Sequence, residues 1–186
     1  NSNVSNTFAT DGEYTVVMTA TDRAGNTATE QTLHFTLDVT APAISVIGTK
    51  DYLVTKDKVS IQFSVTESYY ETNQVRITGT RKDTDGKQTN LNIEGWANTG
   101  KTSSLSQEFT EDGYYTITIE STDRAGNRRS ETIHFTIDTQ PPVNAELGQY
   151  NGKYLKKFVL EEALEDLISE LTSPTVKMTL NGSGYD

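Results

Sequence analysis

Cysteine is absent from this chain of 186 residues, so no disulfide can form and no thiol can act as a nucleophile. Histidine is scarce: His34 and His134 have no recognisable nucleophile partner, and they occupy the same outward position of two repeated strands. The Walker and dinucleotide glycine patterns that cradle phosphates are also missing. These absences argue against catalysis, and no residue is assigned a catalytic, cofactor-binding or metal-binding role from a motif.

Long apolar runs and excess positive charge are lacking as well. No stretch approaches the roughly 20 apolar residues that a membrane-spanning helix needs, and we expect no signal peptide or anchoring signal within these residues. Lys and Arg number 16 against 26 Asp and Glu, giving a net charge of −10. Acidic proteins repel nucleic acid and anionic lipid. We therefore expect no nucleic-acid partner and no membrane insertion by this segment.

A repeated segment about thirty residues long is the main feature that is present. The hexapeptide TDRAGN occurs at residues 21–26 and 122–127, and in both places DG-x-Y-T precedes it and FT(L/I)D follows. A spacing of about a hundred residues is the length of one β-sandwich domain. We expect residues 1–39 to be the C-terminal part of one repeat, 40–140 a complete repeat, and 141–186 the N-terminal part of a third.

Alternating apolar and polar residues predict strands with one buried face. In the complete repeat the apolar positions are Val59, Ile61, Phe63, Val65, Val75, Ile77, Leu91, Ile93, Leu105, Phe109, Tyr115, Ile117, Ile119, Ile133, Phe135 and Ile137. About seven short strands in a hundred residues indicate an all-β, immunoglobulin-like sandwich, repeated in tandem. Residues 160–171 instead space their apolar side chains helically, so we predict one short helix there.

The two repeated motifs have structural explanations. DG-x-Y lies before the penultimate strand, where a tyrosine corner would bond its hydroxyl to nearby backbone. TDRAGN closes the last hairpin, its Asp accepting hydrogen bonds from backbone amides while Gly and Asn tolerate positive φ. The structural motif residues are Asp11, Gly12, Tyr14, Asp22, Gly25, Asn26, Asp112, Gly113, Tyr115, Asp123, Gly126 and Asn127.

The succession DG-x-Y-T, TDRAGN and FT(L/I)D, followed by a proline-containing linker, resembles bacterial immunoglobulin-like (Big-type) repeats, which are related in style to hyaline-repeat domains. The resemblance covers the complete repeat and the first partial one. It implies an extracellular or bacterial cell-surface location, in a cell-wall-anchored or secreted parent, and a non-catalytic stalk or spacer in an adhesin-like protein. Two alternatives stay open: an adhesive module that recognises host glycan or matrix protein, and an accessory domain of a secreted carbohydrate-active enzyme.

The linkers at residues 38–42 and 138–142 are short and contain proline, which restricts φ at its own position and favours extended geometry before it. We expect semi-rigid joints, with neighbouring repeats of the parent chain as partners. Segments of about forty residues seldom bury a core alone. We therefore also expect residues 1–39 and 141–186 to complement each other, preferentially between two copies of the chain.

Three further hypotheses concern individual residues. Calcium, the one cofactor considered, would draw on acidic loop residues, and Asp83-Thr84-Asp85-Gly86 imperfectly matches part of an EF-hand loop; the acidic candidates are Asp38, Asp83, Asp85, Glu111, Asp112 and Asp138. An internal isopeptide bond would join Lys56 or Lys58 to Asn127 or Asp138, but no inward acceptor is visible. Ligand binding would use Tyr69, Tyr70 and Trp96, the last of which fits a core position equally well.

Overall fold

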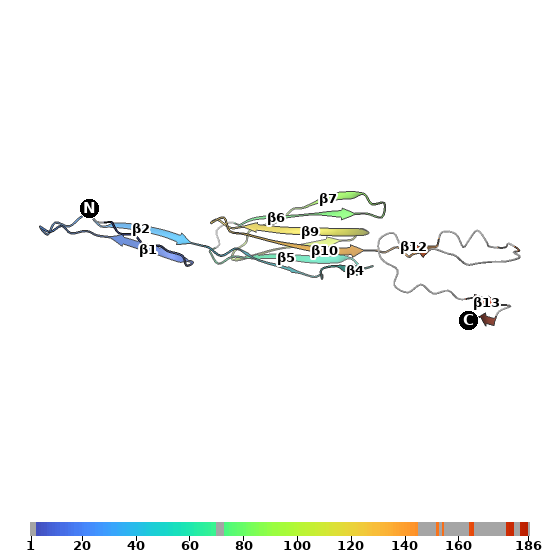
Figure 1. The fold of residues 1–186 in the computed structure, drawn as a ribbon. Coiled ribbons are helices and arrows are strands. Elements are labelled where there is room, and N and C mark those ends of the chain that lie inside the picture. The colour runs from blue at the N-terminus through green and yellow to red at the C-terminus, as the bar shows by residue number, and fades with distance from the viewer. Residues whose placement is uncertain are drawn as a thin grey trace.

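β-Strands are the only regular elements among the residues that the structure describes, which are 3–69, 73–144, 152, 154, 164–165, 178–180 and 183–185. The structure is a computed structural model. It confirms the predicted all-β fold, and residues 43–137 form two sheets that pack face to face (Figure 1). No helix in this part of the chain is long and apolar enough to cross a membrane.

The complete sandwich consists of a three-stranded and a five-stranded sheet. The first has the order β3-β5-β8, with β3 at Ala43–Ile47, β5 at Val59–Thr66 and β8 at Thr102–Phe109. The second has the order β4-β10-β9-β6-β7, with β4 at Leu53–Thr55, β6 at Gln74–Lys82, β7 at Gln88–Ile93, β9 at Gly113–Thr122 and β10 at Arg128–Ile137. This is an immunoglobulin-like arrangement.

The chain changes sheets between β3 and β4. β3 pairs with β5 in an antiparallel manner, whereas β4 pairs in parallel with β10, Leu53 opposite Phe135. Gly48 permits the crossing: its φ is +101°, and a Cβ there would lie 2.1 Å from the Ser60 carbonyl oxygen. The first segment of the repeat therefore supplies an edge strand to each sheet, β3 to one and β4 to the other.

The core lies where the predicted apolar faces meet. Along β5 every second side chain is buried, and Ile77, Ile117, Ile119, Phe135 and Ile137 close against them from the other sheet. Tyr115 stacks on Phe135 with ring centroids 4.7 Å apart, and Phe109 meets both rings edge-on. Aromatic pairs in these geometries add to the free energy that burial contributes.

Residues 1–39 contribute a separate hairpin of β1 (Gly12–Met18) and β2 (Gln31–Leu37), with Tyr14 opposite Phe35. Figure 1 shows the hairpin and the sandwich following one another along one long axis. Phe8 packs edge-on against Tyr14 and Phe35. Among the described residues no second sheet covers this hairpin, and Leu33 remains 58% exposed.

The third segment contains the short strands β11 (Val143–Asn144), β12 (Leu164–Glu165), β13 (Met178–Leu180) and β14 (Ser183–Tyr185). The predicted helix over 160–171 is wrong at residues 164–165, because β12 pairs with β11 in an antiparallel ladder; its other positions lie outside the described residues. The spacing of the apolar side chains favours a helix, but hydrogen bonding between β11 and β12 gives the backbone a strand conformation there. Figure 1 places β12 at the end of the sandwich opposite the β1–β2 hairpin, so these two do not pair within this chain.

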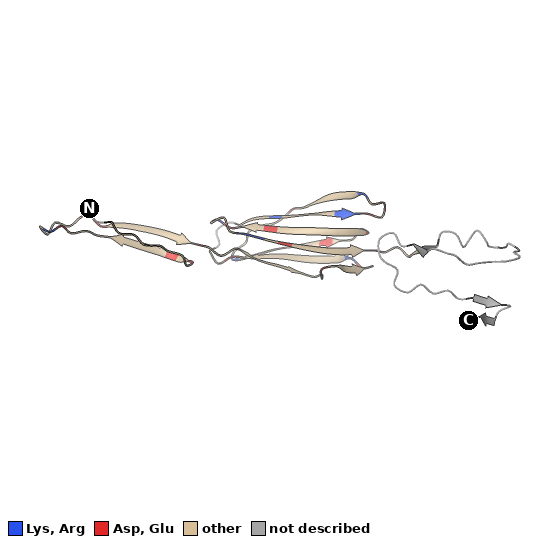
Figure 2. Cartoon of the chain, in the orientation of Figure 1, with Lys and Arg blue, Asp and Glu red and all other residues tan. Residues whose placement is uncertain are grey.

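Acidic and basic side chains are spread along the described strands rather than gathered in one stripe (Figure 2). The described surface therefore offers no basic track of the kind that follows a nucleic-acid backbone.

Candidate functional site at the joint between repeats

The structure contains two tyrosine corners. In the sandwich, the Tyr115 hydroxyl donates to the Glu111 carbonyl at 2.7 Å, and in the hairpin the Tyr14 hydroxyl donates to the Thr10 carbonyl at 2.7 Å. Burial raises the pKa of Tyr115, which keeps its hydroxyl protonated as a donor. The DG-x-Y motif therefore folds back on itself in the same way in both repeats.

The two TDRAGN turns also share their internal hydrogen bonds. Asp22 Oδ1 accepts from the Ala24 and Asn26 amides, and these bonds, after that of the Asn26 side chain, hold the pKa of Asp22 below its usual value. Asp123 Oδ1 accepts from the Asn127 amide at 2.9 Å. Gly25 and Gly126 have φ of +91° and +95°. The two asparagines do not adopt positive φ and contribute their side chains instead.

The linker at residues 38–42 is held from both sides. From the preceding hairpin, Asp11 accepts hydrogen bonds from the Thr40 hydroxyl and the Val39 amide, which hold the pKa of Asp11 below its usual value. From the sandwich, Asn127 Nδ2 donates to the Asp38 carbonyl at 3.0 Å. Pro42 is fully buried. We call this set of contacts, made by Asp11 and Asn127 to residues 38–40, the linker clamp.

The second joint repeats the first half of this clamp. Asp112 accepts from the Thr139 amide at 3.0 Å and from the Thr139 hydroxyl at 2.8 Å. Asp38 and Asp138 each cap the amide two residues ahead, those of Thr40 and Gln140. The aspartate of the DG motif thus fixes the departing chain at both joints, a role that the sequence did not suggest.

Three carboxylates converge beside the linker clamp. Asp38 directly follows β2, Glu67 directly follows β5, and Asp123 directly follows β9. One carboxylate oxygen of each lies within 4.8 Å of the others. Glu67 is only 4% exposed and Asp123 only 7%, which is uncommon for acidic side chains. The joint therefore concentrates negative charge where solvent access is small.

A pocket of about 710 Å³ opens next to these carboxylates. Its lining comes from the hairpin, the linker and the loops of the sandwich, namely Glu13, Thr36, Asp38, Ser68, Tyr69, Lys101, Arg124 and Ala125. Tyr69 is half-buried, and its amide bonds Glu67 Oε1. Of the two predicted ligand-binding residues that the structure describes, Tyr69 lies at this pocket and Trp96 does not.

The structure does not bring Trp96 to the joint. Trp96 packs against the hydrophobic core, with Nε1 donating to Asn98 Oδ1 at 3.2 Å. Tyr70 lies outside the described residues. The three aromatics are therefore not shown as one platform.

The acidic loop at residues 83–86 is a turn. Asp83 Oδ1 accepts from the Asp85 amide at 3.1 Å and the Lys87 amide at 2.8 Å. The Glu111 carboxylate pairs with Arg81. These contacts suit turn capping and ion pairing, and among the described residues the acids that do converge include only Asp38 from the predicted calcium set.

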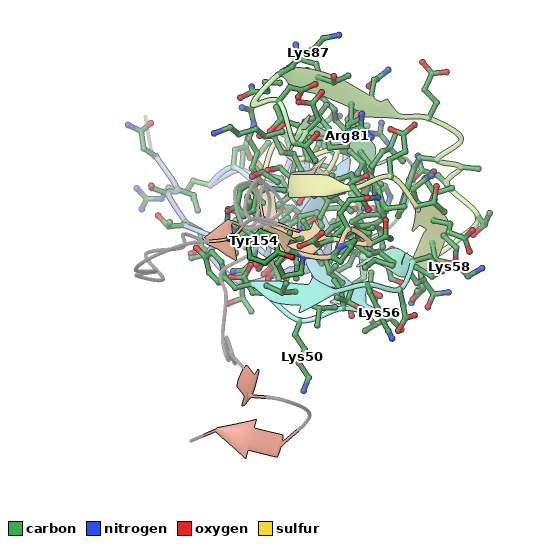
Figure 3. The ribbon with its side chains drawn as sticks, turned by 90° about the vertical axis from the view of Figure 1, so that its right-hand side faces the viewer. Lys50, Lys56, Lys58, Arg81, Lys87 and Tyr154 are labelled. Carbon is green, nitrogen blue, oxygen red and sulfur yellow. The ribbon has the colours of Figure 1, made fainter. Side chains whose placement is uncertain are left out.

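The histidines and the candidate isopeptide lysines have other partners. His134 bonds Asp51 at 3.0 Å and stacks on Tyr52, while His34 bonds Thr15. Lys58 Nζ lies 2.6 Å from the Glu108 carboxylate. Figure 3 shows Lys56 and Lys58 at the periphery of the sandwich, away from its core. The Asn127 amide is used in the linker clamp.

Glu67 and Asp123 are the residues of this site that sequence reasoning missed as possible ligands. The sequence indicated a turn role for Asp123 and no particular role for Glu67. Only the packing of the β5 and β9 ends against the linker brings them to Asp38.

Comparison with known families agrees with this geometry. The sequence matches the family described as bacterial Ig-like domain over residues 2–39 and again over residues 47–139. No curated protein is similar enough to the chain to count as a match. Domains of this family are generally non-catalytic structural modules and typically occur in surface or extracellular proteins. With its two-sheet sandwich, tyrosine corners and tandem motifs, the chain belongs to the bacterial Ig-like domain family.

Proposed function

We propose that the chain is part of a non-catalytic stalk, in which tandem sandwiches space a functional head from the surface of a bacterial cell or from a secreted parent. The linker clamp is the observation that carries this proposal. A spacer needs joints that resist bending, and here Asp11 from one repeat and Asn127 from the next both hold the residues between them.

Two further features support stiff joints. Pro42 is buried and fixes its own φ, which removes rotational freedom at the point where the linker enters β3. The Asp112–Thr139 contacts repeat half of the clamp at the second joint. A linker that makes directed hydrogen bonds to both neighbours transmits orientation, whereas a solvated linker of the same length would behave as a flexible coil.

The joint can be tested by distance measurements between spin labels. Since the chain has no cysteine, Thr27→Cys in the hairpin and Lys87→Cys in the sandwich give two unique attachment sites on exposed positions. We expect a narrow distance distribution. Adding Asp11→Ala and Asn127→Ala together should broaden it, because both sides of the linker clamp are then removed.

A label pair within the sandwich, Thr84→Cys with Lys58→Cys, is the matched control. Its distribution should stay narrow in all variants. A broad hairpin-to-sandwich distribution in the otherwise unchanged chain would contradict a stalk and favour independent beads.

Recognition of glycan or matrix protein by loop aromatics has less support. Trp96 is partly buried against the core, so less of its ring is free for stacking on a ligand. Screening the whole chain against glycans and matrix proteins tests this alternative directly. Saturable binding that Tyr69→Ser abolishes would make the chain an adhesive module and would displace the stalk proposal.

We also propose that two copies of this chain associate, with residues 1–39 of one copy complementing residues 141–186 of the other. In the sandwich, β4 pairs with β10 and β6 pairs with β9. Tyr154–Leu155 matches Tyr52–Leu53, where β4 begins, and Val176–Thr179 matches Val75–Thr78 within β6. We propose that these segments of a second copy pair with β2 and β1, the equivalents of β10 and β9.

The mass in solution tests this pairing. We expect a dimer or a higher multiple that dissociates on dilution, and Phe35→Asp, on the inner face of β2, should shift it to the monomer. Thr32→Asp, on an exposed position of the same strand, is the control. A monomeric mass at every concentration would exclude complementation.

A further inference from the structure

The outer face of the five-stranded sheet carries a second pocket, which the stalk proposal does not use. It has a volume of about 620 Å³ and lies over β6, β7 and β9. Apart from Gly79 and Leu91, the described residues that line it are threonines, asparagines and one arginine, with no carboxylate among them. The pocket therefore differs from the rest of a chain whose net charge is −10.

The strand register arranges the polar side chains of this pocket in two rows. β6 pairs with β7 on one side and with β9 on the other, and a Cβ at Gly79 would lie only 2.3 Å from the Thr116 carbonyl oxygen, so β6 and β9 lie close together. The two rows are Asn92–Thr78–Thr118 and Asn90–Thr80–Thr116. Neighbouring Cβ atoms in such rows are about 4.5–5.5 Å apart. A ring that carries several hydroxyls can therefore contact more than one of these groups at once.

Several of these hydroxyls are available to a ligand. Thr78, Thr80 and Thr116 are half-buried, and no hydrogen bond within the described part of the chain engages their hydroxyls, whereas the Thr118 hydroxyl bonds that of Thr132 at 2.9 Å. None of the three is among the buried side-chain atoms without a partner, so solvent reaches each one. A ligand that enters the pocket can therefore exchange hydrogen bonds with them in place of water.

Arg76 supplies the one formal charge in the lining. It is exposed on β6, and the ion pairs of the described residues do not include it, although Glu120 lies opposite on β9. A guanidinium group presents its N–H donors in a planar fork that matches a carboxylate. The charge of the pocket therefore fits a ligand with a negative group at this end.

We propose that this pocket binds an acidic saccharide, with a carboxylate of the sugar at Arg76 and its hydroxyls on the two rows. Threonine hydroxyls and asparagine amides both donate and accept hydrogen bonds, as sugar hydroxyls do. A folded protein partner would need a more apolar centre. The one apolar side chain in the lining, Leu91, packs against the core of the sandwich instead.

This inference goes beyond the stalk proposal, because it involves neither the linker clamp nor either joint. Thr78 and Thr118 lie in the middle of β6 and β9, so the saccharide would lie along the side of the sandwich. Neither Tyr69 nor Trp96 lines the pocket, which is therefore distinct from a site built on loop aromatics. A stiff joint and an empty pocket, or the reverse, are both measurable outcomes.

Calorimetric titration of the whole chain with short carboxylate oligosaccharides tests the site. The probes are oligomers of hyaluronan, polygalacturonate, alginate and polysialic acid. We expect saturable binding of at least one, which weakens as salt is added. The methyl ester of that oligomer keeps the sugar hydroxyls but lacks the charge, and it should bind at least about ten-fold more weakly. Acetate, which offers a carboxylate alone, should give no saturable signal at millimolar concentration.

Two variants separate the charge from the hydroxyls. Arg76→Gln removes the charge at an exposed position and should weaken binding of the same oligomer by at least about ten-fold. Thr116→Val removes one hydroxyl while keeping the shape of the side chain, and should weaken it by about three-fold to ten-fold. Arg23→Gln is the matched control, because Arg23 is also exposed but belongs to the β1–β2 hairpin and lies outside the pocket. Its affinity should equal that of the unchanged chain.

Nuclear magnetic resonance gives the position of the bound saccharide. The side-chain amide signals of Asn90 and Asn92 should shift on titration, and binding without these shifts would contradict the proposal. It is also overturned if none of the oligomers binds saturably, if polyglutamate binds as tightly as the saccharide, or if Arg76→Gln and Arg23→Gln behave alike. Should Thr116→Val fail to fold by Trp96 fluorescence, Arg76→Gln decides the question.

Discussion

The β1–β2 hairpin and the β9–β10 hairpin carry nearly the same sequence in two different surroundings. Both make the tyrosine corner at 2.7 Å, and both close with the same aspartate–asparagine contacts. Their burial differs sharply: Met18 is 62% exposed, whereas Ile119, at the equivalent position, is 1% exposed. The motif therefore sets the local backbone by itself, and the facing sheet determines only how much the side chains contribute to stability.

This comparison predicts which substitutions affect the sandwich. Trp96 is the single tryptophan and packs on the core of the sandwich, so its fluorescence reports the unfolding of that domain and not of the hairpin. The glycine, phenylalanine and asparagine pairs below each change the same motif position in both hairpins.

The largest difference in the unfolding free energy of the sandwich is expected between Phe135→Ala and Phe35→Ala. Phe135 is 0% exposed and contacts both Tyr115 and Phe109, so truncation leaves a cavity. We expect the free energy of unfolding to fall by about 3–5 kcal/mol. Phe35→Ala should leave it unchanged in urea titrations followed by Trp96 fluorescence. Equal losses would show that the hairpin and the sandwich unfold as one unit.

A smaller difference is expected between Gly113→Ala and Gly12→Ala. Gly113 has φ of +145°, and a Cβ there would lie 2.6 Å from the Lys82 carbonyl oxygen on β6. At Gly12 the nearest atom to an added Cβ belongs to the Tyr14 ring, at an ordinary 3.5 Å. We expect Gly113→Ala to cost about 1–3 kcal/mol of unfolding free energy.

Gly12→Ala should be neutral for the sandwich and should leave the circular dichroism of the chain unchanged. If Gly113→Ala were equally neutral, β6 would have to move away from β9 at that end, and amide exchange at Lys82 would rise.

Patterns of local origin were predictable from the sequence. The alternation in β5 gave its buried face correctly because period-two patterning depends only on neighbours along the strand. The hydroxyl bonds of Tyr14 and Tyr115 span four residues, so the motif alone contains both partners.

Long-range features were not predictable. The parallel pairing of Leu53 with Phe135 has no local signature, and neither does the meeting of Glu67 with Asp123. From the sequence, Trp96 fits a loop position and a core position equally well. In the structure, Asn98 accepts a hydrogen bond from Trp96 and donates one to the distant Asn73 carbonyl, and this long-range contact holds the loop. At residues 164–165 the apolar spacing is helical, but the backbone forms a strand because it pairs with β11.

Comparing Asn127→Ala with Asn26→Ala distinguishes the effect of the linker clamp from the effect of the turn's own hydrogen bonds. Asn127 Nδ2 donates to Asp123 Oδ2 and to the Asp38 carbonyl, whereas Asn26 Nδ2 donates to Asp22 within its own turn. Losing the Asn127 contacts should cost about 1 kcal/mol in the sandwich and should speed amide exchange at Val39.

Asn26→Ala should change neither quantity, because the Val39 amide donates to Asp11 and the adjoining Asp38 carbonyl accepts from Asn127, whereas the side-chain bond of Asn26 stays within its own turn. Faster exchange at Val39 in Asn26→Ala would place the control of the linker in the hairpin turn instead.

The smallest effect concerns acid stability. The His134 amide, helped by its side chain, holds the pKa of Asp51 below its usual value, and Lys58 does the same for the pKa of Glu108. A lowered folded-state pKa stabilises the fold above the unfolded value, and this contribution is lost as pH falls through the folded value. The sandwich should therefore lose stability below about pH 4, and Asp51→Asn should make that loss shallower.

Asp22 also has a lowered pKa, from its contacts with Asn26, but it belongs to the hairpin. Asp22→Asn should consequently leave the acid limb of the Trp96-monitored stability curve unchanged. Because all these carboxylates are exposed, the change in slope, not the total stability, is the quantity to compare. If Asp22→Asn and Asp51→Asn flattened the acid limb equally, the β1–β2 hairpin and the sandwich would be coupled through the linker clamp, and the independence inferred from their burial would be wrong.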